Sequence, residues 1–195
     1  MKDSVKNFDV VPCSRSDIRE FIETHHYSKN INGCISDYCF KLMRNDEMIG
    51  AMFYGKLAMA GQYKRFSDNI DDVIELRRLV CIDDTPRNTE SYFIGKTLRW
   101  LKKNTKIKIV VSYADQEYGH VGTIYKASNF EYWGFRKGAK KVKYNGKLYH
   151  DRATRVYYNG ELKPFSRELK EALERGEAEW VNTAGKHTFV YKVRK

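Results

Sequence analysis

ELRRLVCIDDTPRNTESYFIGKTLRWLKKNTKIKIVVSYADQEYGHVGTIYKASNFEYWGF, which covers Glu75 to Phe135, is the stretch that decides the fold. It predicts a helix over Asn88–Lys103 between two strands, and the second strand, Ile107 to Tyr113, is rich in β-branched residues. The polar sequence Tyr113-Ala114-Asp115 ends that strand. Strand, helix and strand with polar residues at the strand end is the arrangement by which α/β enzymes place their chemistry at the carboxyl edge of a sheet.

Patterns on either side of this stretch predict the remaining elements. Alternating apolar and polar residues predict strands, whereas apolar residues spaced three and four apart predict helices. The expected strands are residues 6–13, Tyr38 to Arg44, Met48 to Tyr54, Val73 to Ile82, a hairpin of Lys140 to Tyr144 with Lys147 to Tyr158, and His187 to Arg194, and the expected helices are residues 16–25, Thr123 to Ser128, and Pro164 to Gly176 with Ser166 as its cap. Trp133-Gly134-Phe135 is expected to form a turn, and Gly55 to Asp72 a polar excursion that could cover a site. The order predicts an α/β fold with a mixed twisted sheet and helices packed on both faces, formed by one domain over residues 1–195.

The composition is that of a globular protein, with 42% hydrophobic and 14% aromatic residues in 195. No apolar run approaches the roughly 20 residues that span a bilayer, and the first residues lack the apolar core of a secretory signal. The 4 cysteines include no C-x-x-C pair, which favours reduced thiols over a zinc site. We therefore expect a cytoplasmic protein without a membrane partner, whose oligomeric state the sequence leaves open.

The net charge of +11 is unevenly distributed, because residues 136–148 carry six Lys or Arg and no acid. Aromatic residues, among them Tyr132, Phe135 and Tyr149, are interleaved with this basic tract. Aromatic rings can stack on exposed bases while cations hold phosphates, so the tract favours nucleic acid over the alternative of a generally lysine-rich protein. The expected DNA-binding residues are Arg136, Lys137, Lys140, Lys141, Lys143 and Arg152.

The order of elements resembles the GNAT acyltransferase fold, in which a strand, a phosphate-binding loop, a helix and a second strand form an acyl-CoA site. A set of short motifs resembles one branch of that fold, the phage Mom family. These motifs are His26-Tyr27-Ser28, Phe53-Tyr54-Gly55, Glu75-Leu76-x-Arg78-Leu79, Asn88-x-x-Ser91, Ser112-Tyr113-Ala114-Asp115, Gly119-His120-x-Gly122-Thr123-Ile124-Tyr125 and Tyr191. Mom proteins convert adenine in phage DNA to N6-carbamoylmethyladenine, which shields the DNA from host restriction enzymes. The resemblance implies a GNAT-like transferase that modifies adenine in double-stranded DNA.

The loop after the first strand of this half-site departs from the usual acyl-CoA pattern. That pattern carries glycines whose backbone N–H groups cradle a pyrophosphate, whereas Asp83 to Ser91 contains no glycine and several acids. The Mom branch also lacks the glycine-rich loop. The donor therefore stays open between an acyl-CoA-type molecule and another small donor.

Asp115 at the end of a buried strand is a candidate general base toward an adenine amino group, whose lone pair is delocalised into the ring. The alternative is an N-cap for the following turn. His26 with Tyr27 is a candidate on the family match, and His26, His120 and Asp115 would make a two-histidine, one-carboxylate set suited to Fe(II).

Four further residues complete the candidate catalytic set. Arg78 on an apolar strand would bind an anion, or else form a salt bridge to Glu75 or Glu90. Ser91 in the first turn of the central helix would donate to a substrate oxygen, or else cap the helix. Tyr54 and Tyr125 would orient or stack a flipped base or protonate a leaving group, and each could equally be a tyrosine at the edge of the core.

Two other function classes fit the same sequence. One is an ordinary GNAT acyltransferase that acts on a protein, a tRNA or a small amine. The other is a nucleic-acid-binding module that kept the fold and lost the chemistry. The sequence does not show which of Ser112 and Tyr113 faces the site.

Overall fold

The structure is a computed structural model that describes residues 4–59 and 61–194. The described chain divides into two compact units. The first unit contains Met1–Ala114, Gly122–Gly134 and Thr188–Lys195, and the second contains Asp115–Val121 and Phe135–His187.

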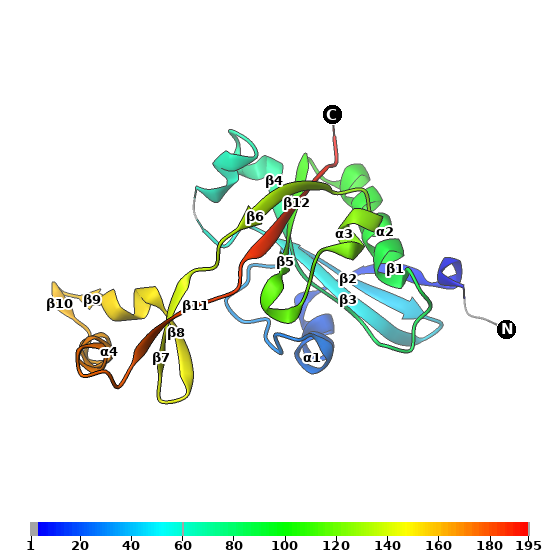
Figure 1. Cartoon of the computed structure of the whole chain (residues 1–195). Helices are drawn as coiled ribbons and strands as arrows, with labels where there is room; N and C mark the ends of the chain where they lie inside the picture. The colour runs from blue at the N-terminus through cyan, green and yellow to red at the C-terminus, as the bar shows by residue number, and fades with distance from the viewer. Residues whose placement is uncertain (1–3, 60, 195) are drawn as a thin grey trace. The chain divides into compact units, whose positions relative to one another are not determined.

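Figure 1 shows how the helices and strands follow one another along the chain. The α-helices are α1 (Arg15–His25), α2 (Thr89–Asn104), α3 (Thr123–Ala127) and α4 (Pro164–Glu174). The strands are β1 (Asp9–Cys13), β2 (Tyr38–Arg44), β3 (Glu47–Gly55), β4 (Val73–Cys81), β5 (Ile109–Asp115), β6 (Glu131–Arg136), β7 (Lys140–Tyr144), β8 (Lys147–His150), β9 (Tyr157–Tyr158), β10 (Glu161–Leu162), β11 (Glu179–Asn182) and β12 (Lys186–Lys192). Short 3-10 helices connect them at η1 (Val5–Asn7), η2 (Gln62–Arg65), η3 (Ile70–Asp72), η4 (Gln116–Tyr118) and η5 (Asp151–Arg155).

The main sheet has seven strands in the order β1-β2-β3-β4-β5-β12-β6. Strands β1 to β4 pair antiparallel with their neighbours, and β4 pairs parallel with β5. Helix α2 connects these two parallel strands, as the crossover of a βαβ unit must. The mixed α/β sheet predicted from the sequence is confirmed.

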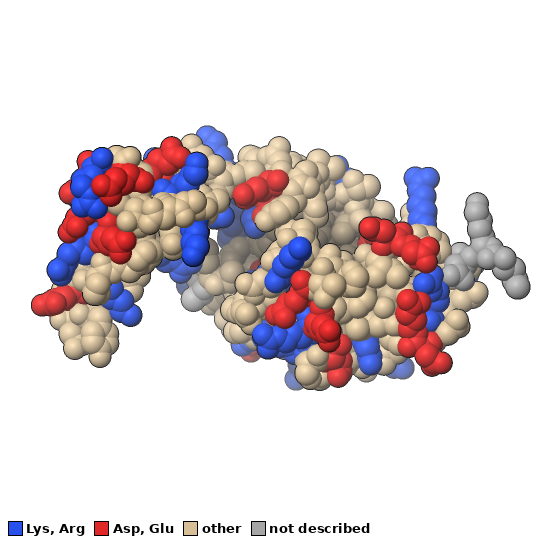
Figure 2. All heavy atoms as spheres, turned by 90° about the horizontal axis from the view of Figure 1, so that it is seen from below, with Lys and Arg blue, Asp and Glu red and all other residues tan. Residues whose placement is uncertain are grey.

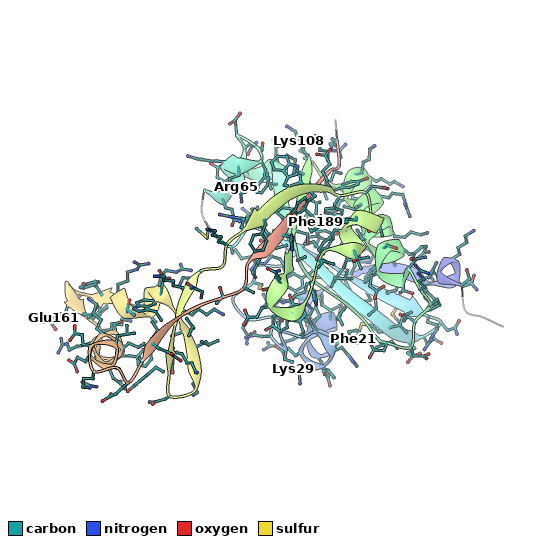
Figure 3. All side chains as sticks on the ribbon, in the orientation of Figure 1. Phe21, Lys29, Arg65, Lys108, Glu161 and Phe189 are labelled. Carbon is teal, nitrogen blue, oxygen red and sulfur yellow. The ribbon has the colours of Figure 1, made fainter. Side chains whose placement is uncertain are left out.

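Helices cover both faces of this sheet, because the strands present apolar side chains alternately to each side. On one face, Phe93 and Leu98 of α2 pack with Phe40 and Met52. On the opposite face, Ile18 and Ile22 of α1 pack with Ala51 and Phe53. Figure 1 shows α1 on the side of the sheet away from α2 and α3, and Figure 3 places the labelled Phe189 of β12 in the interior beside α3.

The segment between β3 and β4, predicted as a polar excursion, carries η2 and η3 and packs on the sheet. Leu57, Tyr63 and Phe66 lie against a cluster formed by Val73, Val111 and Val190. The excursion therefore covers one face of the sheet at β4, β5 and β12.

The second unit has a small sheet of its own, in the order β11-β7-β8. Helix α4 packs on it through a core of Val142, Leu169, Ala172 and Ala178. The β9–β10 hairpin turns at Asn159-Gly160, both with positive φ, as a two-residue hairpin turn requires.

Several local predictions are wrong. Trp133-Gly134-Phe135 is not a turn but lies inside β6, where Gly134 has a φ of +95°. Strand β11 has no counterpart in the sequence prediction, because four residues with a short apolar pattern give little signal. The second arm of the basic hairpin ends at His150 instead of Tyr158, since η5 follows.

The predicted cap of α4 is also wrong. Lys163 is the N-cap and Pro164 the first helical residue, so Ser166 lies within the helix. Ser166 is buried and accepts a hydrogen bond from the Val156 amide, which fastens the β9–β10 hairpin to α4. Gly176 follows the helix with a φ of +75°, as the predicted stop requires.

Candidate active site

The candidate site of the first unit lies where two parallel strands separate. Strands β4 and β5 pair over three residues, Val73 with Ile109, Ile74 with Val110 and Glu75 with Val111. Beyond Glu75 and Val111 both strands continue without pairing to each other, and we call the place where they part, at their carboxyl ends, the opening. The carboxyl ends of the strands are the edge of an α/β sheet where ligands of this fold class bind.

A β-bulge accounts for the separation. Opposite Phe53 and Tyr54 of β3, the register of β4 passes from Arg78 to Leu76, so Arg77 is an extra residue. A bulge bends its strand and re-aims side chains. Here it bends β4 directly after the last residue that pairs with β5.

The bulge directs both arginines toward the segment that follows α1. Arg77 forms an ion pair with Glu75 at 2.9 Å and donates to the Cys34 thiol at 3.3 Å. Arg78 donates to the backbone carbonyls of Asn30 and Arg77. The alternative of a salt bridge from Arg78 to Glu75 is therefore wrong, because Arg77 makes that bridge. The spare N–H groups of the Arg78 guanidinium remain available to an anion.

Residues 26–37, which we call the α1–β2 loop, are held by further polar contacts. Arg15 donates two hydrogen bonds, of 2.6 and 2.7 Å, to the carbonyls of Cys34 and Ile31. The loop also passes so close to Gly55 that a Cβ there would lie 1.7 Å from the Ile35 carbonyl oxygen. The loop is thus pinned at several points, which fixes the residues at its start.

His26 and Tyr27 occupy that start. His26 is the C-cap of α1 and is 4% exposed, and its Nδ1 lies 2.8 Å from the Ser28 hydroxyl. The Tyr27 ring lies against it, with 4.1 Å between ring centroids. Tyr27 is exposed, so this pair presents an aromatic surface to solvent.

Tyr125 of α3 brings a phenol to the same region. Its ring packs on Phe130 and Phe189, with centroids 5.6 and 5.3 Å apart. Burial raises the pKa of Tyr125 to about 12, the neighbouring Ser112 hydroxyl lowers it, and Tyr27 and Glu75 raise it further. Tyr125 is therefore a protonated phenol at neutral pH and can donate a proton or a hydrogen bond.

The structure also decides which strand residue shares this face. Ser112 lies two residues from both Val110 and Ala114, so it shares their face of the strand. Those two residues belong to the core under α2 and α3. Tyr113 points to the opposite face, where its hydroxyl accepts a 2.6 Å hydrogen bond from Gln62. Ser112, which the sequence prediction did not select, is therefore on the side of Tyr125.

Tyr54 supports the site from the interior. It is fully buried, and its hydroxyl lies 2.7 Å from the Thr97 hydroxyl of α2. Burial raises its pKa well above the usual range. A base cannot stack on a ring with no exposed surface, so Tyr54 can only position its neighbours.

The loop before α2 turns its hydroxyls onto its own backbone. Thr85 donates to the Ile82 carbonyl, Thr89 to Pro86 and Ser91 to Asn88. Asn88 is the N-cap, with a φ of +72° and no side-chain hydrogen bond to the helix. Asp84 lies 3.5 Å from Arg44, and Glu90 is in the first turn. These residues do not form a glycine-type cradle for a pyrophosphate.

Asp115 belongs to the second unit. Its carboxylate accepts a hydrogen bond from the Glu117 amide as the N-cap of η4 and forms a 2.7 Å ion pair with Lys186. The alternative of an N-cap role is thus present in the structure. His120 follows in the same unit, beside Tyr118.

Over residues 4–59 and 61–194, no three His, Cys, Asp or Glu side chains form a group that could hold a metal ion. His26 lies in the first unit, whereas Asp115 and His120 lie in the second. The Fe(II) set built from them stays a prediction.

The basic tract lies in the second unit. Lys140, Lys141 and Lys143 are on β7, Arg136 and Lys137 come just before it, and Arg152 is in η5. All are exposed except Lys141, which is half-buried. Lys143 pairs with Glu179 at 3.1 Å. On the face drawn in Figure 2, Lys and Arg are interspersed with Asp and Glu instead of forming one patch.

The aromatic residues near the tract divide into two groups. Tyr144 and Tyr149 pack against α4, where the Tyr144 hydroxyl donates to Glu168. Tyr132, Trp133 and Phe135 are exposed. Trp133 is 41% exposed with its ring near Phe66, so it is not a core residue.

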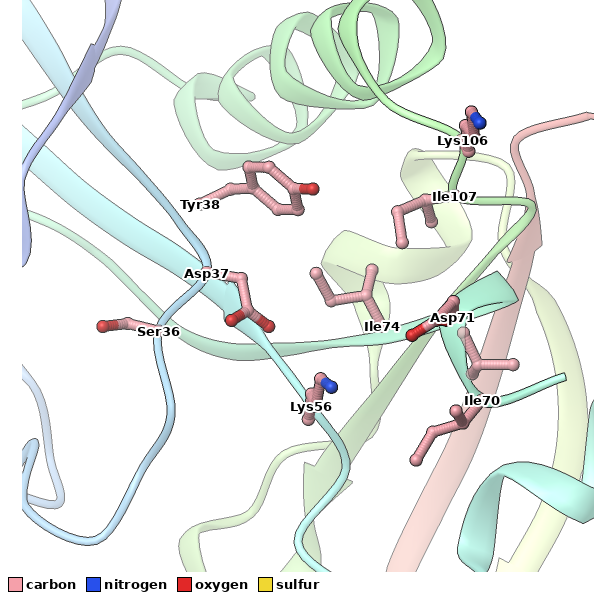
Figure 4. Close-up of a pocket in the computed structure, with 10 residues that line it drawn as sticks. Ser36, Asp37, Tyr38, Lys56, Ile70, Asp71, Ile74, Lys106 and Ile107 are labelled. Atoms are coloured by element: carbon pink, nitrogen blue, oxygen red, sulfur yellow. The ribbon is translucent and has the colours of Figure 1, made fainter.

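A cavity of about 600 Å³ in the first unit lies at the other edge of the sheet. Figure 4 shows it lined by Tyr38 at the start of β2 and Lys56 just after β3, together with Ile74 of β4 and Ile107 just before β5. Ile74 and Ile107 mark the amino ends of β4 and β5. Because α/β proteins place their chemistry at the carboxyl ends, we assign the candidate site to the opening instead.

Comparisons with solved structures confirm the fold. The chain superimposes on the ribosomal-protein-S18-alanine N-acetyltransferase from Escherichia coli with a TM-score of 0.53, 8% identity, and coverage of 96% of this chain and 95% of that one. It superimposes on NAA60 from Arabidopsis thaliana in complex with acetyl-CoA with a TM-score of 0.54, 12% identity, and coverage of 95% and 98%. These likenesses show a GNAT-type acetyltransferase fold.

Sequence comparison gives a closer relationship. The chain is 28% identical over 137 residues to the methylcarbamoylase Mom of Escherichia phage Mu. The match covers 68% of this chain and 56% of that protein, so it spans little more than half of the relative's length. The model of the Mom protein family matches residues 7–195, nearly the whole chain, and this chain therefore belongs to the Mom protein family.

Proposed function

We propose that this chain is a DNA-modifying transferase that adds a small carbamoylmethyl-like group to the N6 amine of adenine in DNA and so protects it from restriction. Membership of the Mom family over residues 7–195, with a relative named as a methylcarbamoylase, carries the proposal. The transferase fold and a net charge of +11 support it, because the charge suits a polyanionic partner. Such an enzyme would act in the cytoplasm of the host cell, where the DNA is.

The reacting groups would gather at the opening between β4 and β5. The Tyr125 phenol, protonated at neutral pH, would donate a hydrogen bond or proton to the donor's leaving group. Tyr27 beside His26 would offer its exposed ring to an extruded base. Arg78 would bind a carbonyl or anionic part of the donor through the N–H groups that its backbone contacts do not use.

Two groups would act on the amine and the donor. Asp115, which ends the strand that carries Ser112, would accept the proton that the adenine amine releases. Ser91 in the first turn of α2 would donate to a donor oxygen when its bond to the Asn88 carbonyl is exchanged. Tyr54 would hold the surrounding core. No step of this scheme depends on a metal or on CoA, whose usual phosphate cradle this loop does not provide.

DNA would be held by the second unit. The exposed side chains of Arg136, Lys137, Lys140, Lys143 and Arg152, together with the half-buried Lys141, would contact phosphates. Extruding a base costs a few kcal/mol, which phosphate contacts and stacking would offset.

Mass spectrometry of nucleosides tests the proposal. DNA from cells that express the chain is digested, and deoxyadenosine is examined for the mass of an added carbamoylmethyl group. A modified deoxyadenosine that disappears in a Tyr125→Phe variant expressed to the same level supports the function. Unmodified DNA with robust expression contradicts it. Acetylation of a protein, tRNA or amine would then support the ordinary acyltransferase, and DNA binding without any product would support the binding module.

A further inference from the structure

Ser112 is a fully buried hydroxyl at the opening. It is the first residue of β5 beyond the three pairs with β4 and has 0% exposure. Its Oγ makes no hydrogen bond to any residue that the structure describes. A buried hydroxyl without a partner costs about 1–3 kcal/mol, so its presence on a strand asks for an explanation.

The neighbours of Ser112 are the groups of the candidate site. Its side chain is on the face of Val110 and Ala114, toward α3. The hydroxyl is close enough to Tyr125 to interact with the phenol and lower its pKa, although the two groups do not meet at the distance and angle of a hydrogen bond, while Tyr27 and Glu75 raise that pKa. Glu75 is the last β4 residue that pairs with β5. Two hydroxyls, those of Ser112 and Tyr125, therefore adjoin the point where the strands part.

Thr188 of β12 is a natural comparison. It is also fully buried, and its hydroxyl also has no hydrogen-bond partner within the described part of the chain. Thr188 alternates with Phe189 and so shares the face of Val190, in a cluster distinct from the core around Tyr125. The same kind of orphan hydroxyl thus occurs once beside the candidate site and once on the other face.

We infer that the hydroxyls of Ser112 and Tyr125 together bind the carbonyl or carboxamide oxygen of the transferred group. This inference rests on the proposed transferase function. A serine and a tyrosine hydroxyl can each donate one hydrogen bond, and a carbonyl oxygen accepts two. Donors fixed in a water-poor site stabilise charge that develops on such an oxygen without reorganising. Ser112 then makes a well-formed hydrogen bond only when the transferred group is bound, which explains why it makes none in the chain alone.

The first test compares two variants that each delete one buried hydroxyl with little change in shape, Ser112→Ala and Thr188→Val. The rate at which modified deoxyadenosine accumulates is measured by mass spectrometry, and unfolding temperature is measured in parallel. We expect Ser112→Ala to lower the rate by roughly 100- to 1,000-fold, in the range for losing one such donor. Its unfolding temperature should change little, since only the contact of this hydroxyl with Tyr125 is lost. Thr188→Val should keep the full rate.

Equal rates for Ser112→Ala and the wild-type chain would overturn the inference. So would an equal loss of rate in Thr188→Val, because the effect would then belong to buried hydroxyls in general.

A second test does not depend on modification of DNA. The full chain is labelled with ¹³C at the tyrosine ring carbon that bears the hydroxyl, and the Tyr125 signal is identified as the one missing in Tyr125→Phe. Acetamide, which carries the proposed carboxamide, is added as the probe. We expect it to shift the Tyr125 signal in the wild-type and Thr188→Val chains and not in Ser112→Ala.

The two tests separate the inference from the function. A shifted Tyr125 signal in a chain that never modifies DNA supports the oxygen-binding pair and contradicts the proposed function. Modified deoxyadenosine without any shift, at full rate in Ser112→Ala, supports the function and contradicts the pair.

Discussion

Arg77, and not Arg78, holds Glu75, with 2.9 Å between Nη1 and Oε2 and side chains only 11% and 13% exposed. The pair lies at the bulge of β4, because Glu75 is the last residue that pairs with β5 and Arg77 is the extra residue without a partner in β3. It therefore holds the strand bent at the place where the opening begins. Arg78 keeps donors for a ligand because its neighbour provides the ion pair.

Breaking this ion pair should destabilise the fold. Arg77→Ala removes the guanidinium that pairs with the buried Glu75 carboxylate, and such losses cost about 3–5 kcal/mol. Urea unfolding measures the change. Lys192→Ala is the matched control, since it removes an exposed ion pair with Glu131 at 3.4 Å, which is worth about 0–1 kcal/mol. A double variant, Glu75→Gln with Arg77→Met, should recover part of the loss. Equal costs for Arg77→Ala and Lys192→Ala would refute the structural role.

Arg15 should act at a distance on the candidate site. Its two hydrogen bonds to the carbonyls of Ile31 and Cys34 fix the α1–β2 loop that begins at His26 and Tyr27. We expect Arg15→Ala to speed amide hydrogen exchange in residues 26–37 and to lower the yield of modified deoxyadenosine several-fold. Glu20→Ala, an exposed position on the same helix, should change neither. Unchanged exchange in Arg15→Ala would contradict the role.

The sequence predicts the βαβ core well because long periodic segments carry strong signals. Helix α2 was expected at Asn88–Lys103 and lies at Thr89–Asn104, and β2 lies at its predicted bounds. Two short strands were not predicted. Strand β11 has only four residues without clear alternation, and in the strand through Trp133 a Gly suggested a turn.

The candidate site was predictable only in part. Sequence motifs identified Tyr125 and His26 as candidate site residues, but no pattern in the sequence reveals that Arg77 is a bulge residue. The side to which Ser112 points follows from register, which alternation within one strand cannot supply. Neither long-range feature has a local signature.

One substitution can distinguish the two possible roles of Asp115, which are general base and N-cap of η4. Asp115→Asn keeps an oxygen to accept from the Glu117 amide but cannot accept a proton at neutral pH. If Asp115 is the general base, the yield of modified deoxyadenosine should fall at least about 100-fold while the unfolding temperature changes little. Lys186→Ala, which removes the ion pair, controls for the lost charge contact. A fully active Asp115→Asn would leave Asp115 as a cap only.

The free energy of unfolding should fall in alkaline solution because Tyr125 loses its proton more easily in the unfolded chain. Its pKa in the folded chain is about 12, above the usual value of 10, so the unfolded chain releases this proton first. The preference for the protonated phenol is therefore fully present below pH 10 and is lost as the pH rises from 10 toward 12. Tyr125→Phe should unfold with a shallower loss of stability across that window, measured by urea unfolding at stepped pH. Parallel curves for the two chains would contradict the burial of this phenol.

The basic tract should govern DNA affinity through salt. If Arg136 and Lys137 contact phosphates, each neutralised contact adds about 0.9 to the slope of log affinity against log salt for duplex DNA. We expect the Arg136→Ala, Lys137→Ala variant to bind every sequence more weakly and to reduce that slope by about two, as measured by fluorescence anisotropy. Lys102→Ala with Lys103→Ala, at the exposed end of α2, removes the same charge outside the tract. An equal effect from both variants would show that net charge alone attracts DNA, and the assignment of the tract as the contact surface would fail.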